Sequence, residues 1–195
     1  MIISGGIYRF SNEHFAGVLR VFTLDNKLVF YDDWDEESET WLSINNKSIM
    51  YRQMPLSLME RHSTLLEKSN FTNGELSKIR PDLPLNIGVN ENLSWYVSKM
   101  EFLNLVSKLE CDAYFEIERL CFFTLRKNGN IIKKPHYLSS GNGQLSVREI
   151  LTFAYSLQQE NPKLKFEGIG IFRCGYNNEV PSYYIGGCDR YANPS

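Results

Sequence analysis

The sequence predicts an α+β protein with mostly antiparallel sheets and about three helices. Short alternating apolar runs bounded by turn residues recur towards both ends of the chain, which is typical of strands. Three segments elsewhere carry apolar residues at helical spacing. No apolar run approaches the roughly 18 residues that a membrane-spanning helix needs. With 195 residues, of which 43% are hydrophobic and 23% charged, the chain is long enough for one moderate domain or two small ones.

The N-terminal residues predict a small, strongly bent sheet, for which an SH3-like barrel is one arrangement. The polar turn at 24–26 is of the kind that closes a hairpin, and the strand before it has apolar residues on both faces. Five short strands are expected, at residues 7–10, 16–22, 27–34, 41–43 and 48–53.

A helix is predicted to follow this sheet. Pro55 suits the start of a helix, because its missing N–H has no partner in the first turn anyway. Apolar spacing extends this helix over residues 56–68. Residues 71–92 are rich in Gly, Pro and Asn with little periodicity, which predicts a loop or linker. The expected organisation is an N-terminal β-rich subdomain at 1–70 with one helix, this linker, and a C-terminal α+β subdomain at 93–195.

The C-terminal part predicts two helices and at least two hairpin strands. Helical spacing covers residues 94–109. The Asn128-Gly129 turn predicts that residues 121–126 pair with residues 131–137. Ser146 and Glu149 have the spacing of a capping box, which starts a helix that runs to about Gln159. Two further strands are expected at 166–174 and 182–186.

One short segment concentrates negative charge. Six of the eight residues from 32 to 39 are acidic, although the net charge of the whole chain is only −2. Exposed carboxylates steer a basic partner and a desolvated aromatic ring anchors it. A solvated turn between strands is an equally compatible interpretation. A calcium site is disfavoured, because the spacing lacks the glycine of a calcium loop. The candidate partner-binding residues are Asp32, Asp33, Trp34, Asp35, Glu36, Glu37, Glu39 and Trp41.

The leading functional hypothesis is a non-catalytic cytoplasmic protein of bacterial or phage origin. It would cover the functional surface of another protein with a basic surface, as an immunity protein, antitoxin or phage-type inhibitor does. No catalytic residue, metal site, cofactor or membrane association is assigned. The N-terminus lacks the pattern of a signal peptide. The four cysteines are too widely spaced for a zinc finger, so they are expected to be reduced and buried.

A basic hairpin provides the second hypothesis, a nucleic-acid-binding accessory protein. The chain has no acidic residue between Arg119 and Arg148. The polar loop at 139–143 precedes a helix N-terminus, where backbone amides attract anions. The candidate contact residues are Arg126, Lys127, Lys133, Lys134 and His136.

A divergent hydrolase or nuclease is the third hypothesis. His136 with Ser139, Ser140 or Cys174 would supply a base and a nucleophile if the fold brought them together. Glu116 and Glu118 are predicted on one face of a strand, as a metal-binding pair. Neither the Gly-x-Ser-x-Gly nor the His-Glu-x-x-His motif is present.

Overall fold

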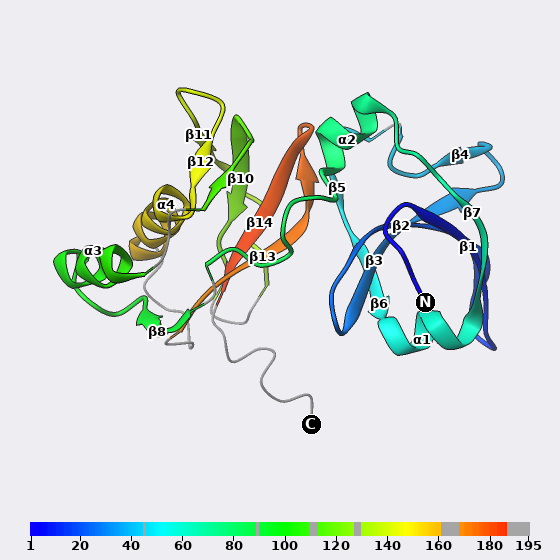
Figure 1. Cartoon of the computed structure of the whole chain (residues 1–195), viewed down its shortest axis with the longest axis horizontal. Coiled ribbons are helices and arrows are strands. Elements are labelled where there is room, and N and C mark those ends of the chain that lie inside the picture. Colours follow the sequence, from blue (N-terminus) through cyan, green and yellow to red (C-terminus); the bar gives the residue numbers. More distant parts are fainter. Residues whose placement is uncertain (45, 89, 110–112, 127–129, 161–167, 187–195) are drawn as a thin grey trace. The chain divides into compact units, whose positions relative to one another are not determined.

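The computed structural model describes residues 1–44, 46–88, 90–109, 113–126, 130–160 and 168–186 (Figure 1). The predicted fold class is confirmed: the described chain is α+β, with antiparallel sheets and four helices where about three were expected. It divides into two compact units. The first comprises Met1–Leu85 and Gly175–Val180, and the second comprises Asn86–Cys174 and the residues from Pro181 onward. None of the described helices is long and apolar enough to cross a membrane.

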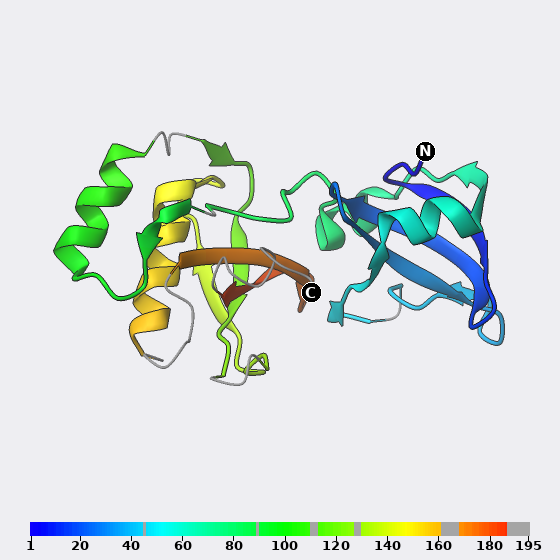
Figure 2. The same cartoon turned by 90° about the horizontal axis from the view of Figure 1, so that it is seen from below.

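The first unit is built on one bent antiparallel sheet in the order β4–β3–β2–β1–β7, with β6 also paired to β3. The strands curve beside helix α1 in Figure 2. This arrangement is consistent with the expected SH3-like sheet. The elements are β1 (Gly6–Ser11), β2 (Ala16–Leu24), β3 (Leu28–Asp35), β4 (Thr40–Trp41), β5 (Ile49–Met50), β6 (Arg52–Pro55), α1 (Leu56–His62), β7 (Ser63–Lys68) and α2 (Asn73–Ile79).

This sheet buries side chains on both faces, because successive residues of a strand point to opposite sides. Leu19 and Val21 of β2 are fully buried in a core cluster that α1 closes with Met59. Phe22 points to the other face and joins a second cluster. The strand is therefore apolar on both sides, as its sequence indicates.

The helix predicted over residues 56–68 is wrong in its second half. Helix α1 ends at His62, and the next six residues form β7, which pairs antiparallel with β1. Leu65 and Leu66, which helical spacing would place on one apolar stripe with Leu58 and Met59, are 48% and 46% exposed. Pairing with a strand more than fifty residues earlier outweighs the local helical pattern here, and a single sequence does not reveal that pairing.

The second core cluster includes a segment distant in the chain. Tyr176 is 2% exposed and packs with Phe22, Tyr51 and other apolar residues of the first unit. Its neighbour Gly175 pairs with Met50 and has φ +142°, where a Cβ atom would lie 1.9 Å from the carbonyl oxygen of residue 49. Only glycine fits this close approach.

Helix α2 closes this cluster with Ile79, and it lies within the residues predicted as linker. The sequence signal for it was local: Thr72 and Glu75 form a capping box, in which each side chain accepts from the other residue's backbone N–H. The same range, 71–92, contains the boundary between Leu85 and Asn86 at which the two units divide.

In the second unit, helices α3 and α4 accompany a sheet in the order β11–β10–β14–β13. The pair β10–β14 is parallel. Phe153 of α4 lies 5.6 Å from the ring of Phe122 in β10, and Tyr155 stacks on Phe102 of α3 at 4.1 Å. The elements are β8 (Asn90–Ser94), α3 (Lys99–Lys108), β9 (Tyr114–Phe115), β10 (Arg119–Phe123), β11 (His136–Ser139), β12 (Leu145–Ser146), α4 (Val147–Gln159), β13 (Gly168–Asn177) and β14 (Val180–Gly186).

Two local predictions in this unit are confirmed. Cys121 pairs with Tyr137, and Leu125 bridges to Ile131, so the chain folds back as expected, although the turn residues 127–129 lie outside the described residues. The capping box of α4 is also present. The Ser146 hydroxyl accepts from the Glu149 N–H at 3.2 Å, and the Ser146 N–H donates to the Glu149 carboxylate at 2.8 Å.

Candidate partner-binding surface

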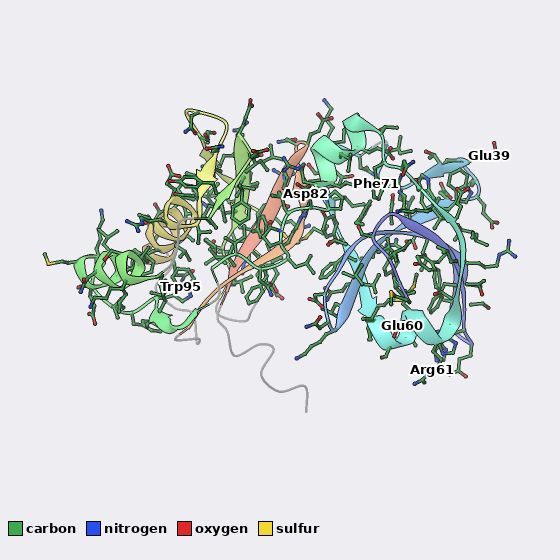
Figure 3. All side chains as sticks on the ribbon, in the orientation of Figure 1. Glu39, Glu60, Arg61, Phe71, Asp82 and Trp95 are labelled. Carbon is green, nitrogen blue, oxygen red and sulfur yellow. The ribbon has the colours of Figure 1, made fainter. Side chains whose placement is uncertain are left out.

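The acidic segment divides into a buried part and an exposed part. Asp32 and Asp33 are only 2% and 8% exposed, so the expectation that they lie on the surface is wrong. Both sit in β3 and form ion pairs within the unit. Asp35 is half-buried, and Glu36, Glu37 and Glu39 are exposed in the turn between β3 and β4. We call Asp35, Glu36, Glu37 and Glu39 the acidic turn; Glu39 lies at its outer end (Figure 3).

Asp32 belongs to a buried polar cluster around Arg20, which the sequence analysis did not select. Arg20 is 3% exposed. Its guanidinium lies 3.3 Å from the Asp32 carboxylate and 2.5 Å from that of Glu75, and the Ser43 hydroxyl also donates to Asp32. Burial raises the pKa of Asp32, even though the hydrogen bonds from Ser43 and the charge of Arg20 act to lower it. The one signal in the sequence was a charged residue inside a strand that is apolar on both faces.

Two tryptophans lie at the outer end of this cluster. Trp34 of β3 is paired in register with Trp41 of β4, and their rings are 5.3 Å apart at an interplanar angle of 74°. The Arg20 guanidinium lies 4.7 Å from the centre of the Trp41 ring. Trp41 is 9% exposed and Trp34 is half-buried. A cation–π contact on its buried side therefore holds Trp41 in place.

A groove of about 370 Å³ opens beside these rings. It crosses the sheet, because its lining comes from five neighbouring strands. The bulge in β7, between the positions that face Ile7 and Tyr8, brings two successive residues of that strand into the lining. We call this the Trp groove; its lining residues are Ile7, Val18, Trp34, Trp41, Leu66 and Glu67.

The acidic turn and the Trp groove adjoin. Asp35 pairs with Thr40 at the register position directly after the Trp34–Trp41 pair, and the exposed glutamates connect these two strands. The fold therefore brings together five of the predicted partner-binding residues that are wholly or partly exposed, together with the largely buried Trp41. It adds an apolar groove that the sequence did not indicate, because Ile7, Val18 and Leu66 meet only in the folded sheet.

A second cavity, of about 320 Å³, lies beside Arg20 in the same unit. Its charged groups are already paired: Arg20 with Asp32 and Glu75, and Lys78 with Glu179 at 3.3 Å. Burial acts to raise the pKa of Glu75, but the hydrogen bonds from Thr72 and Arg20, together with the charge of Arg20, outweigh it and lower that pKa. These groups serve the unit itself. This makes the cavity a weaker candidate than the Trp groove.

The basic hairpin of the second unit presents part of its predicted contact set. Arg126, Lys133 and Lys134 are exposed, and His136 is half-buried in β11. Lys127 lies outside the described residues. The hairpin therefore offers three exposed cations.

The polar loop that follows this hairpin uses its backbone amides internally. The Ser140 hydroxyl accepts from the N–H groups of Asn142 at 3.0 Å and Gln144 at 2.9 Å. The cap of Ser146 likewise occupies the first turn of α4. An anion at this loop would have to displace these bonds. This weakens the prediction that the loop and the start of α4 bind an anion such as a phosphate group.

The residues considered for catalysis are poorly placed for it. Burial raises the pKa of the Cys174 thiol to about 12, which disfavours the nucleophilic thiolate. Cys121 and Cys174 are buried and form no disulfide, as predicted, whereas Cys111 and Cys188 lie outside the described residues. Glu116 and Glu118 fall between β9 and β10, so their predicted place on one strand is wrong. Among the described residues, no three His, Cys, Asp or Glu side chains form a metal-binding group.

Comparison of the chain with protein-family models, with curated proteins and with solved structures finds no match.

Proposed function

We propose that this chain is a non-catalytic binding protein that covers a basic surface of a macromolecular partner, in the manner of an immunity protein, an antitoxin or a phage-type inhibitor. The observation that supports this most directly is the junction of the acidic turn with the Trp groove on one face of the first unit. The partner we propose is another protein. The setting we propose is the cytoplasm, where thiols such as those of the buried Cys121 and Cys174 stay reduced.

The two halves of this surface have complementary roles. The exposed carboxylates of Glu36, Glu37 and Glu39 raise the association rate with a basic partner and make that rate fall with salt. The groove supplies apolar area and aromatic rings, which carry most of the binding energy in protein interfaces. Asp32 and Asp33 are excluded from the contact, because their carboxylates are buried inside the unit.

The test uses two variants with the same change in charge. The first carries Asp35→Asn, Glu36→Gln, Glu37→Gln and Glu39→Gln. The control carries Glu→Gln at four exposed positions elsewhere, namely Glu13, Glu60, Glu116 and Glu118. Each is immobilised beside the unmodified protein, and retained proteins from an extract of the source cells are quantified by mass spectrometry.

A partner is a basic protein that the unmodified chain and the control retain and the acidic-turn variant loses. With that partner purified, association should slow at least about tenfold in the acidic-turn variant, and its salt dependence should flatten. If the two variants retain the same proteins, or associate with a retained protein at the same rate, the acidic turn is not a binding surface and the proposal is wrong.

The nucleic-acid hypothesis remains as a second candidate, supported by the exposed Arg126, Lys133 and Lys134 in a stretch without acidic residues. Each phosphate contact releases counterions, so affinity should fall linearly with salt on logarithmic axes. Changing Lys133 and Lys134 to Gln should reduce that slope by about two. A chain that leaves the mobility of RNA and DNA unchanged at low salt has no such function.

A further inference from the structure

The chemistry of the Trp groove points to one kind of side chain on the partner. We infer that the groove holds the guanidinium group of a single arginine, against the indole of Trp34 and the carboxylate of Glu67. This inference rests on the proposed function and deepens it, because it says which group of the basic partner the first unit recognises.

The indole rings supply the first part of the argument. Tryptophan offers the strongest π-face for a cation, and Trp34 and Trp41, whose rings meet at 74°, both line the groove. The unit already contains this contact, since Arg20 lies 4.7 Å from the centre of the Trp41 ring. Its charge is balanced by Asp32 and Glu75, so it does not repel a second cation. Trp34, the less buried of the two rings, remains accessible from the groove.

Glu67 supplies the second part. Among the described residues that line the groove it is the one carboxylate, and it is exposed. Within the described part of the chain, no cation lies within ion-pair distance of it. The bulge in β7 turns Leu66 and Glu67 into the groove together, so an apolar wall and a negative charge stand side by side. This pairing matches an arginine side chain, which carries its positive guanidinium on a long apolar stem.

Size and hydration select arginine. About 370 Å³ is near the lower limit for small-ligand pockets, which suits one long side chain. A guanidinium is planar and weakly hydrated, so it stacks on an indole and still donates two hydrogen bonds to a carboxylate. A lysine ammonium is a compact, strongly hydrated charge and loses more when it leaves water.

The test needs no natural partner. The chain has three tryptophans, and each gives one indole N–H signal in a ¹H–¹⁵N NMR spectrum. Trp95 is 3% exposed, donates to the carbonyl of Gly186 and belongs to the second unit, so it is an internal reference. The probes are the capped tripeptides Gly-Arg-Gly and Gly-Lys-Gly. The arginine peptide should shift the Trp34 and Trp41 signals with a dissociation constant of about 1–10 mM and leave Trp95 unmoved, and the lysine peptide should bind at least about threefold more weakly.

Three variants separate the contributions. Trp34→Leu keeps an apolar wall but removes the π-face, and Glu67→Gln removes the charge; each should weaken binding of the arginine peptide at least about threefold. Glu60→Gln is the control, because Glu60 is an exposed glutamate in α1 that does not line the groove. Circular dichroism verifies that all three fold.

Three results would overturn the inference: no shift of Trp34 up to about 50 mM peptide, equal binding of the two peptides, or equal binding by Trp34→Leu and the unmodified chain. If the Trp34 signal does not shift but a basic partner still depends on the acidic turn, only the arginine inference is wrong and the proposed function is kept. A partner that is insensitive to the acidic turn removes the proposed function even where the arginine peptide binds.

Discussion

Replacing Arg20 by methionine should destabilise the first unit strongly, because it leaves a buried carboxylate without its cation. Asp32 is 2% exposed and can regain little hydration, and breaking such a pair on one side costs about 3–5 kcal/mol. Asp32 keeps its hydrogen bonds from the backbone and hydroxyl of Ser43, and Glu75 has a side chain 22% exposed that water can solvate. We therefore expect the lower end of that range, about 3 kcal/mol.

The assay is urea unfolding followed by tryptophan fluorescence in a Trp95→Phe background, so that the signal comes from Trp34 and Trp41 of the first unit. Arg9→Met is the control, since Arg9 is exposed on the neighbouring strand β1; its free energy of unfolding should change by less than about 0.5 kcal/mol.

A second change tests the cause of the loss. Adding Asp32→Asn to Arg20→Met removes the buried carboxylate that has lost its cation, so the double variant should be more stable than Arg20→Met alone. A loss below about 1 kcal/mol in the single variant, or a double variant whose loss is the sum of the two single losses, would refute the reasoning.

Four further predictions follow from the structure. Burial raises the pKa of Asp33 above 3.8, so the ionised form costs stability; the free energy of unfolding should fall as pH rises from about 4 through the folded-state pKa, and Asp33→Asn should flatten this fall in urea titrations. Ser146→Ala should cost about 1 kcal/mol through loss of the α4 cap, measured by urea unfolding of the chain with Trp95 retained as the probe of the second unit. Gly175→Ala should lower the stability of the first unit by more than about 2 kcal/mol, since its Cβ would clash with backbone. Cys174 should resist iodoacetamide at pH 8 in the folded protein and react after unfolding, as mass spectrometry of its peptide would show.

The parts of the fold that the sequence predicted correctly depend on neighbouring residues. The cap of α4 needs only Ser146 and Glu149, and the hairpin of β10 and β11 is closed by an Asn-Gly turn. Both signals lie within a few residues, so they do not depend on contacts with distant parts of the chain. The capping box of Thr72 and Glu75 is a signal of the same kind, but it stands in a Gly- and Pro-rich stretch that lacks helical periodicity, and the helix there was missed.

Two of the errors concern contacts between distant residues. Residues 63–68 became β7 because β1 pairs with them. Asp32 is of a residue type that is usually exposed, but it is buried because Arg20 and Ser43, which lie 12 and 11 residues from it in the chain, enclose it. The candidate surface shows both cases: the acidic turn is continuous in sequence and was predicted, whereas the groove needs Val18 and Leu66 on one face of the folded sheet and was not.

The contribution of Gly175–Val180 to the first unit has a consequence for how the protein is made. A ribosome releases the chain from its N-terminus, so Tyr176 emerges after the whole segment from Asn86 to Cys174 has been synthesised. At about 5–20 residues per second, the second core cluster lacks Tyr176 for roughly 5–20 s after Leu85 has been added. During this interval the residues that pack with Tyr176 in the native cluster, among them Phe22 and Tyr51, lack the contact with its ring. Completion of the first unit therefore waits for the translation of nearly all of the second.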